Sequence, residues 1–229
     1  MESDLRQAPA DDSIEAYLPG YRFGIVLLLL LATFVFMAAG FSGSWVALVT
    51  VMLQGATLLA ALRAAQVGQR YMPLTFLLVL GALAGAVVAT FFSSGNVQGG
   101  LFLLNVVLVA VAPVVIARSI LRRGVIDVHA VLGALCIYVF IGMLWAFLYN
   151  AIGAIGSEPF FVQTHNATTA DYLYFSYVTQ TTVGYGDLTA ATGFGRALAV
   201  LEALTGQIYL VTVVALLVTN LRRTTRFER

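Results

Sequence analysis

The sequence predicts an all-α membrane protein with six transmembrane helices and one re-entrant helix. Of its 229 residues, 60% are hydrophobic and 10% are charged, and the mean hydropathy is +0.92. Soluble domains are about half apolar and a quarter charged, so this composition indicates a membrane protein. The formal net charge of +1 gives no indication of a nucleic-acid partner.

Six apolar runs are each long enough to cross the hydrocarbon core of a bilayer, which needs roughly 20 helical residues. They cover residues 22–41, 45–62, 73–92, 101–118, 128–152 and 194–221. Segments rich in Ser, Gly and Pro separate most of them. Residues 1–21 are acidic, unlike the start of a secretory signal, and we expect them to form a cytoplasmic tail.

Arginine placement indicates how the spans are oriented, because short cytoplasmic loops collect Lys and Arg. Arginines precede the first span, lie between the second and third, and follow the fourth and sixth. They are Arg6, Arg22, Arg63, Arg70, Arg118, Arg122, Arg123, Arg222, Arg223, Arg226 and Arg229. Arg196 is the one arginine predicted on the opposite side. We therefore expect a multi-pass protein of the plasma membrane with both termini in the cytoplasm.

The long connection at 153–193 contains a helix too short to cross the membrane. Residues 171–182, DYLYFSYVTQTT, are mostly aromatic or hydroxyl-bearing, and Asp171 is expected to cap the free N–H groups at their start. Such a helix would enter the membrane and stop. Residues 181–187, TTVGYGD, would then return as extended backbone, which must be buried by protein or line an aqueous path.

Two glycines explain what this extended backbone could do. Gly184 and Gly186 stand at alternate positions, and glycine adopts positive φ freely. Alternating backbone handedness would aim successive carbonyl oxygens to one side. A cation needs oxygens all round, so several identical chains would have to meet on an axis.

The TTVGYGD segment resembles the selectivity filter of potassium channels, for which TVGYG is the characteristic sequence. The resemblance covers residues 128–221, where outer helix, pore helix, filter and inner helix follow in the order of that family. It implies a homotetrameric pore embedded in membrane lipids that conducts K⁺ passively. The carbonyls of Thr182, Val183, Gly184 and Tyr185, with the Thr182 hydroxyl, would replace the hydration shell of the permeant K⁺ ions.

The resemblance also assigns residues that support the filter. They are Thr181, Gly186, Asp187, Tyr174, Val178 and Gln180. Asp187 would hydrogen-bond to Tyr174, or alternatively face solvent. Val178 stands where some members of the family have a glutamate, so no carboxyl pair is expected there. Gln180 carries an amide that must find partners when buried, and we expect it to bond to a neighbouring chain.

The last span supplies the predicted cavity and gating residues. They are Glu202, Gly206, Gln207, Leu210, Val214, Ala215 and Val218. Gly206 matches the glycine at which inner helices of the family bend, or it is a small residue that allows close packing. The residues after it fall on one helical face and would line the cavity, with a hydrophobic constriction at 214–218.

Glu202 is an acid within a membrane span, and such residues are functional candidates. We expect it to bond to Ser176 or Thr179. It would either couple the inner helix to the filter or only satisfy its own hydrogen bonds.

The chain divides into a four-helix domain at 22–118, a cytoplasmic linker at 119–127, the pore domain at 128–221 and a cytoplasmic tail at 222–229. The first four helices could be a scaffold, contact lipid or form a ligand site. The tail is expected to be too short for a ligand-binding domain, which leaves a separate regulatory subunit as an alternative.

Three other functions are alternatives to a K⁺ channel. A weakly selective monovalent cation channel would share the architecture. A K⁺ transporter subunit would carry several degenerate filters, whereas this chain has one complete copy. An enzyme is not expected, because no catalytic, metal-binding or phosphate-binding set of residues occurs in or near the spans.

We predict weak voltage dependence. Voltage-gated channels repeat arginine every third residue in their fourth helix, whereas residues 71–117 contain no Asp, Glu, Lys, Arg or His. Moving one charge through the membrane field contributes about 2.3 kcal/mol per 100 mV, so spans without charges respond little. Conductance in symmetric K⁺ should change shallowly with voltage, and a steep curve would contradict the prediction.

Overall fold

The computed structural model describes residues 22–41, 43–66, 77, 79–85, 87, 95–123 and 128–215, and these are mainly helical. The helices are α2 (Arg22–Ala38), α3 (Ser44–Ala64), α5 (Gly95–Arg123), α6 (Val128–Ile155), α7 (Thr169–Gln180) and α8 (Gly193–Tyr209), followed by a π-helical segment, η3 (Leu210–Val214). One isolated antiparallel bridge joins Phe161 to Ala190 within these residues.

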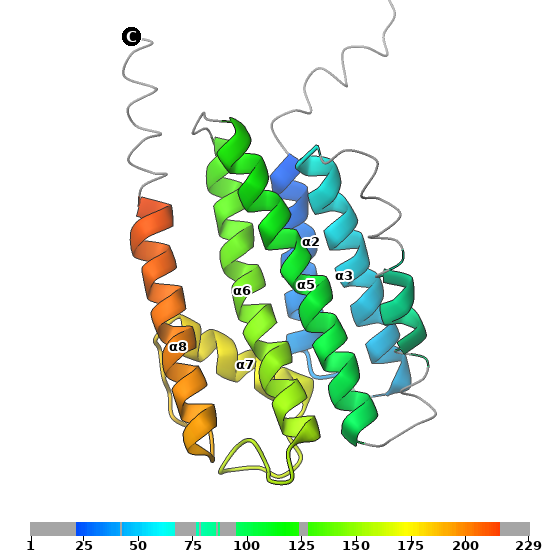
Figure 1. The fold of residues 1–229 in the computed structure, drawn as a ribbon, viewed down its shortest axis with the longest axis vertical. Helices are drawn as coiled ribbons and strands as arrows, with labels where there is room; N and C mark the ends of the chain where they lie inside the picture. Colours follow the sequence, from blue (N-terminus) through cyan, green and yellow to red (C-terminus); the bar gives the residue numbers. More distant parts are fainter. Residues whose placement is uncertain are drawn as a thin grey trace, which may run out of the picture.

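The long helices run side by side, and α7 lies across them beside α6 and α8 (Figure 1). The start of α2 and the ends of α3 and α5 lie at one end of the bundle, whereas α8 begins at the other (Figure 1). Arg22, Arg63 and Arg123 belong to the first three of these ends, and Arg196 belongs to the first turn of α8. Among the described residues, Arg22, Arg63 and Arg123 therefore lie at the end of the bundle opposite to Arg196, as the alternation in the sequence predicted.

Four of the described helices are long and apolar enough to cross a membrane. They comprise Trp45–Ala64, Val97–Arg122, Val128–Ile155 and Gly193–Val213, and Phe23–Ala38 is apolar but shorter. The predicted third span, 73–92, lies largely outside the described residues, of which 77, 79–85 and 87 are helical. Residues 1–21 and 216–229, which include Val218 and the predicted tails, also lie outside them.

The fourth predicted span is longer than expected at both ends. α5 begins at Gly95 and continues to Arg123, so most of the connection predicted at 93–100 and the first part of the linker at 119–127 are helical. One of the glycines that indicated a turn, Gly99, serves a helix contact instead. Gly99 is buried, and a Cβ atom there would collide with the Ile155 side chain of α6.

The helices share one apolar core that also reaches α7. Its buried members include Val26 and Leu30 of α2, Leu58 of α3, Ile116 of α5, and Cys136, Phe140 and Met143 of α6, together with Leu173 of α7. Cys136 is a free, buried thiol. The short helix α7 is thus held by the same core that joins the N-terminal helices to α6.

A second cluster, in which all members but one are aromatic, fixes the connection between α6 and α7. It contains Tyr149, Phe160, Phe161, Tyr172, Phe175 and Ala190. The rings of Phe160 and Phe161 meet edge to face at 4.9 Å, and that of Phe161 lies 5.0 Å from Tyr172. Gly153 makes room for this packing, because a Cβ atom there would collide with the Tyr172 hydroxyl.

A capping box begins α7, two residues before the predicted start. Thr168 is the N-cap, and its hydroxyl accepts a hydrogen bond from the Asp171 N–H at 3.3 Å. Asp171 Oδ2 in turn accepts from the Thr168 N–H at 2.7 Å. The predicted capping by Asp171 is confirmed, although the helix begins earlier: Asp171 is the third helical residue, and it caps by accepting from the N–H of Thr168.

Replacing Thr168 should loosen the start of α7. We expect Thr168→Ala to lower the free energy of unfolding by about 1 kcal/mol, because the Asp171 N–H loses its acceptor. Thr168→Ser keeps the hydroxyl and should remain close to the wild type. Thermal unfolding of the purified protein in detergent measures both, and equal midpoints for the two variants would contradict the capping role.

Candidate functional site

The segment 181–187, called here the filter segment, is tied by its amides to the end of α7. The N–H groups of Thr182 and Val183 donate to the carbonyls of Thr179 and Val178, both at 3.0 Å, and the Gly184 N–H donates to Val178 at 3.2 Å. These carbonyls belong to the last turn of α7, where a helix has no N–H donors of its own to satisfy them. The helix end and the filter segment therefore complete each other's backbone hydrogen bonds.

The backbone of the filter segment changes handedness at every second residue. Positive φ values occur at Thr182 (59°), Gly184 (55°) and Gly186 (79°). The two glycines were predicted to supply this freedom, but Thr182 was not, because threonine gives no sequence signal for positive φ. Its hydroxyl holds the conformation, donating to the Thr181 carbonyl at 2.7 Å and accepting from Gln207 Nε2 at 3.1 Å.

These two features fix the direction of the carbonyl groups. In a trans peptide the C=O of one residue points opposite to the N–H of the next, and no cis peptide occurs among the described residues. Because the N–H groups of Val183 and Gly184 point toward α7, the carbonyls of Thr182 and Val183 point away from it. They face the open side of the chain, where a Cβ atom on Gly184 or Gly186 would meet nothing within 4 Å.

The outer end of the filter segment is held by a side-chain hydrogen bond. The Tyr174 hydroxyl donates to Asp187 Oδ2 at 2.7 Å, which is the predicted pairing. The rings of Tyr174 and Tyr185 also stack, with centroids 6.5 Å apart.

Glu202 of α8 is fully buried behind the filter segment. The Tyr149 hydroxyl of α6 donates to its Oε2 atom at 2.7 Å, and Ser176 of α7 lies 2.5 Å from its Oε1 atom. Ser176 was one of the two predicted partners. Tyr149 was not foreseen, because an aromatic residue in an apolar span gives no sign of its partner.

Gly206 allows α8 to touch the end of α7. A Cβ atom at Gly206 would lie 2.5 Å from the Gln180 carbonyl oxygen. Of the two predictions for this glycine, the structure therefore favours close packing. The amide of Gln180 is fully buried within one chain, and its Nε2 atom donates to the Tyr138 carbonyl of α6 at 2.9 Å. Its Oε1 atom has no hydrogen-bond partner among the described residues. A bond from Gln180 to a neighbouring chain stays a prediction.

Comparison with known proteins agrees with this arrangement. Residues 133–223 match a family model described as an ion channel. This matched region is called here the ion-channel domain. No curated protein and no solved structure matches the chain. The domain contains most of α6 and all of α7, the filter segment and α8, and its family is not enzymatic. With the four long apolar helices, it makes this chain an integral membrane protein.

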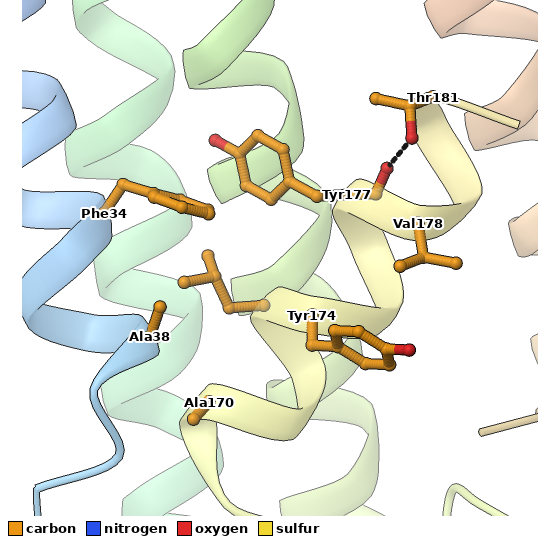
Figure 2. A pocket seen from close by; sticks show the side chains of 8 residues that line it. Phe34, Ala38, Ala170, Tyr174, Tyr177, Val178 and Thr181 are labelled. Atoms are coloured by element: carbon orange, nitrogen blue, oxygen red, sulfur yellow. Dashed lines mark hydrogen bonds between the residues drawn. The ribbon is translucent and has the colours of Figure 1, made fainter. Parts of the chain in front are cut away.

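The first helix contacts the ion-channel domain directly. Figure 2 shows Phe34 and Ala38 of α2 facing Tyr177 and Val178 of α7 across a groove of about 260 Å³. The rings of Phe34 and Tyr177 meet edge to face at 4.8 Å, and the Tyr177 hydroxyl donates to the Val139 carbonyl at 2.5 Å. Val178 lines this groove. Sequence reasoning did not find the contact between α2 and α7.

The predicted cavity residues do not share one α-helical face. Leu210 and Val214 bound the π-helical segment η3, so the periodicity assumed from Gln207 to Ala215 is interrupted. Gln207 Nε2 donates a hydrogen bond to the Thr182 hydroxyl. Tyr209 directly precedes η3, and its hydroxyl donates to the Ala134 carbonyl of α6 at 2.8 Å. Val218 lies outside the described residues.

Much apolar surface of the ion-channel domain is uncovered in a single chain. On the filter segment, Val183 is 52% and Tyr185 is 72% exposed. Large apolar side chains along the last span are also exposed: Phe194, Val200, Leu201, Leu204, Ile208 and Val211. The open side of the filter segment and this face of α8 therefore have no partners among the described residues of one chain.

Adding a methyl group at Gly206 should disturb the contact between α8 and α7. We expect Gly206→Ala to destabilise the protein by about 1–3 kcal/mol, because the Gln180 backbone cannot retreat without distorting the end of α7. Gly193→Ala is the matched control, since nothing lies within 4 Å of a Cβ atom there. Thermal unfolding in detergent compares the two, and equal stabilities would contradict the packing role.

Proposed function

We propose that four copies of this chain form a channel that conducts K⁺ passively and selects it over Na⁺. The observation that carries this proposal is the backbone of the filter segment. Alternate residues have positive φ, and the N–H groups of Thr182, Val183 and Gly184 are engaged by α7. This leaves the carbonyl oxygens of Thr182 and Val183 directed away from α7. We expect the carbonyls of Gly184 and Tyr185 to continue the row, so that all four residues would bind the permeant ions.

The uncovered surfaces support a symmetric assembly. Non-helical backbone at membrane depth must be buried by protein or line water, and one chain supplies oxygens from one direction only. Closed rings of identical subunits are the usual form of homo-oligomers. Four chains around an axis would surround an ion with carbonyl oxygens, and the exposed face of α8 would be the surface that neighbours cover.

Selectivity for K⁺ is inferred from the sequence of the filter segment. Residues 182–186 read TVGYG, the sequence whose carbonyls replace the hydration shell of K⁺ in potassium channels. The hydrogen bond of Tyr174 to Asp187 and the close packing at Gly206 would hold the four filter segments in this arrangement. A hydrophobic constriction at 214–218 would form the inner gate, beyond η3. Arginine placement favours cytoplasmic termini in a plasma-membrane protein, where a separate regulatory subunit could bind.

Ion selectivity distinguishes the proposal from a weakly selective cation channel. Purified protein in a planar bilayer with opposed K⁺ and Na⁺ gradients should give currents that reverse near the K⁺ equilibrium potential. A reversal potential near zero would favour the weakly selective alternative, and transport that requires a second, coupled substrate would favour a transporter subunit.

A glycine variant tests the role of the filter backbone. Gly184→Ala should reduce the K⁺ current at least tenfold, because φ is +55° there and alanine disfavours that conformation. Gly193→Ala should leave the current unchanged, since its Cβ atom meets no neighbour. If both variants conduct like the wild type, the filter segment is not the conducting element.

A further inference from the structure

Three short contacts between oxygen atoms join the helices behind the filter segment. The Tyr149 hydroxyl lies 2.7 Å from Glu202 Oε2, and the Ser176 hydroxyl lies 2.5 Å from Glu202 Oε1. The same Ser176 oxygen lies 2.7 Å from the carbonyl oxygen of Gly142 in α6. Each contact is close enough to require a hydrogen atom between its two oxygens.

Counting hydrogen atoms shows that one is missing if Glu202 is ionised. Tyr149 supplies one hydrogen and Ser176 supplies one, whereas a backbone carbonyl and a carboxylate supply none. Ser176 cannot donate to both Glu202 and Gly142 at once. With an ionised Glu202, two acceptor oxygens would face each other without a hydrogen, but a protonated carboxyl supplies the third. The chain then runs from Glu202 Oε1 to Ser176, and from Ser176 to the Gly142 carbonyl.

The surroundings of Glu202 agree with a neutral carboxyl. Glu202 is 0% exposed in a single chain, so a neighbouring subunit could not reach it without rearrangement. The titratable groups that face it are the phenols of Tyr138 and Tyr149 from α6 and of Tyr177 from α7. No cation is among the groups that interact with it in the part of the chain that the structure describes. A buried carboxylate without a cation is strongly disfavoured.

We propose that Glu202 is held as the neutral acid, and that its proton fastens the inner helix α8 to α7 and, through Ser176, to α6. Glu202 is then a positioning residue: it holds Ser176, which lies on the helix whose last carbonyls anchor the filter segment. Gly206 and Gln207, one turn further along α8, contact Gln180 and Thr182 on the same side. The positioning role rests on the proposed filter, whereas the protonated state of Glu202 does not.

Infrared spectroscopy tests the protonated state independently of conduction. The full-length protein in lipid at pH 7 should show the carbonyl stretching band of a protonated carboxylic acid, which ionised carboxylates lack. Glu202→Gln should remove this band, because the amide absorbs elsewhere. Absence of the band from the wild type, or its persistence in Glu202→Gln, would overturn the proposal.

Rubidium or potassium uptake into proteoliposomes tests the positioning role. Glutamine offers an N–H donor to Ser176 and a carbonyl acceptor to Tyr149, so Glu202→Gln should keep uptake within about twofold of the wild type. Glu202→Leu and Ser176→Ala break the chain of hydrogen bonds and should each lower uptake at least tenfold, with Ser176→Ala serving if Glu202→Leu fails to fold. Wild-type uptake in both of these variants would refute the positioning role.

Raising the pH distinguishes a role of the Glu202 proton from a role of the packing of its side chain alone. Uptake by the wild type should fall over the same pH interval in which the infrared band disappears, because the carboxylate leaves one of the three contacts without hydrogen. Glu202→Gln should show no fall in that interval, although it keeps Tyr138, Tyr149 and Tyr177. Equal pH profiles for the two proteins would refute a role for the proton. If the infrared band behaves as expected but neither the wild type nor any variant takes up ions, the proposed channel function fails and the protonated state of Glu202 stands.

Discussion

The hydrogen bonds between the filter segment and the last turn of α7 are the constraint on which the other features of the site depend. A helix end leaves carbonyls without donors, and an extended segment at membrane depth leaves N–H groups without acceptors. Here the two satisfy each other, since the N–H groups of Thr182, Val183 and Gly184 donate to the carbonyls of Thr179 and Val178. The direction of the free carbonyls follows from this pairing and from peptide planarity.

Because the filter segment is built on α7, everything that fixes α7 also fixes the filter. The capping box of Thr168 and Asp171 determines where the helix begins, and the aromatic cluster around Phe161 and Tyr172 holds its outer half. Ser176 connects its middle to Glu202. α2 approaches its remaining side through Phe34. A short helix of modest intrinsic stability is thus held from several directions.

The sequence predicted the features that depend on local pattern and missed those that depend on distant neighbours. Apolar length located α3 and α6, and the TTVGYGD segment indicated the site and the bond between Tyr174 and Asp187. The glycines at 95–100 suggested a turn, because nothing local shows that Gly99 faces Ile155. In the same way, the partner of Gln180 and the contact of Phe34 with Tyr177 arise from helices far apart in the chain, which periodicity cannot reveal.

The π-helical segment at Leu210–Val214 has a consequence for how the last span is compared with other proteins. A π turn accommodates one more residue than an α turn. The helical phase of the side chains therefore shifts across η3. An ungapped alignment with an inner helix that is α-helical throughout would pair each residue beyond 214 with the wrong counterpart. A one-residue gap within η3 restores the correspondence.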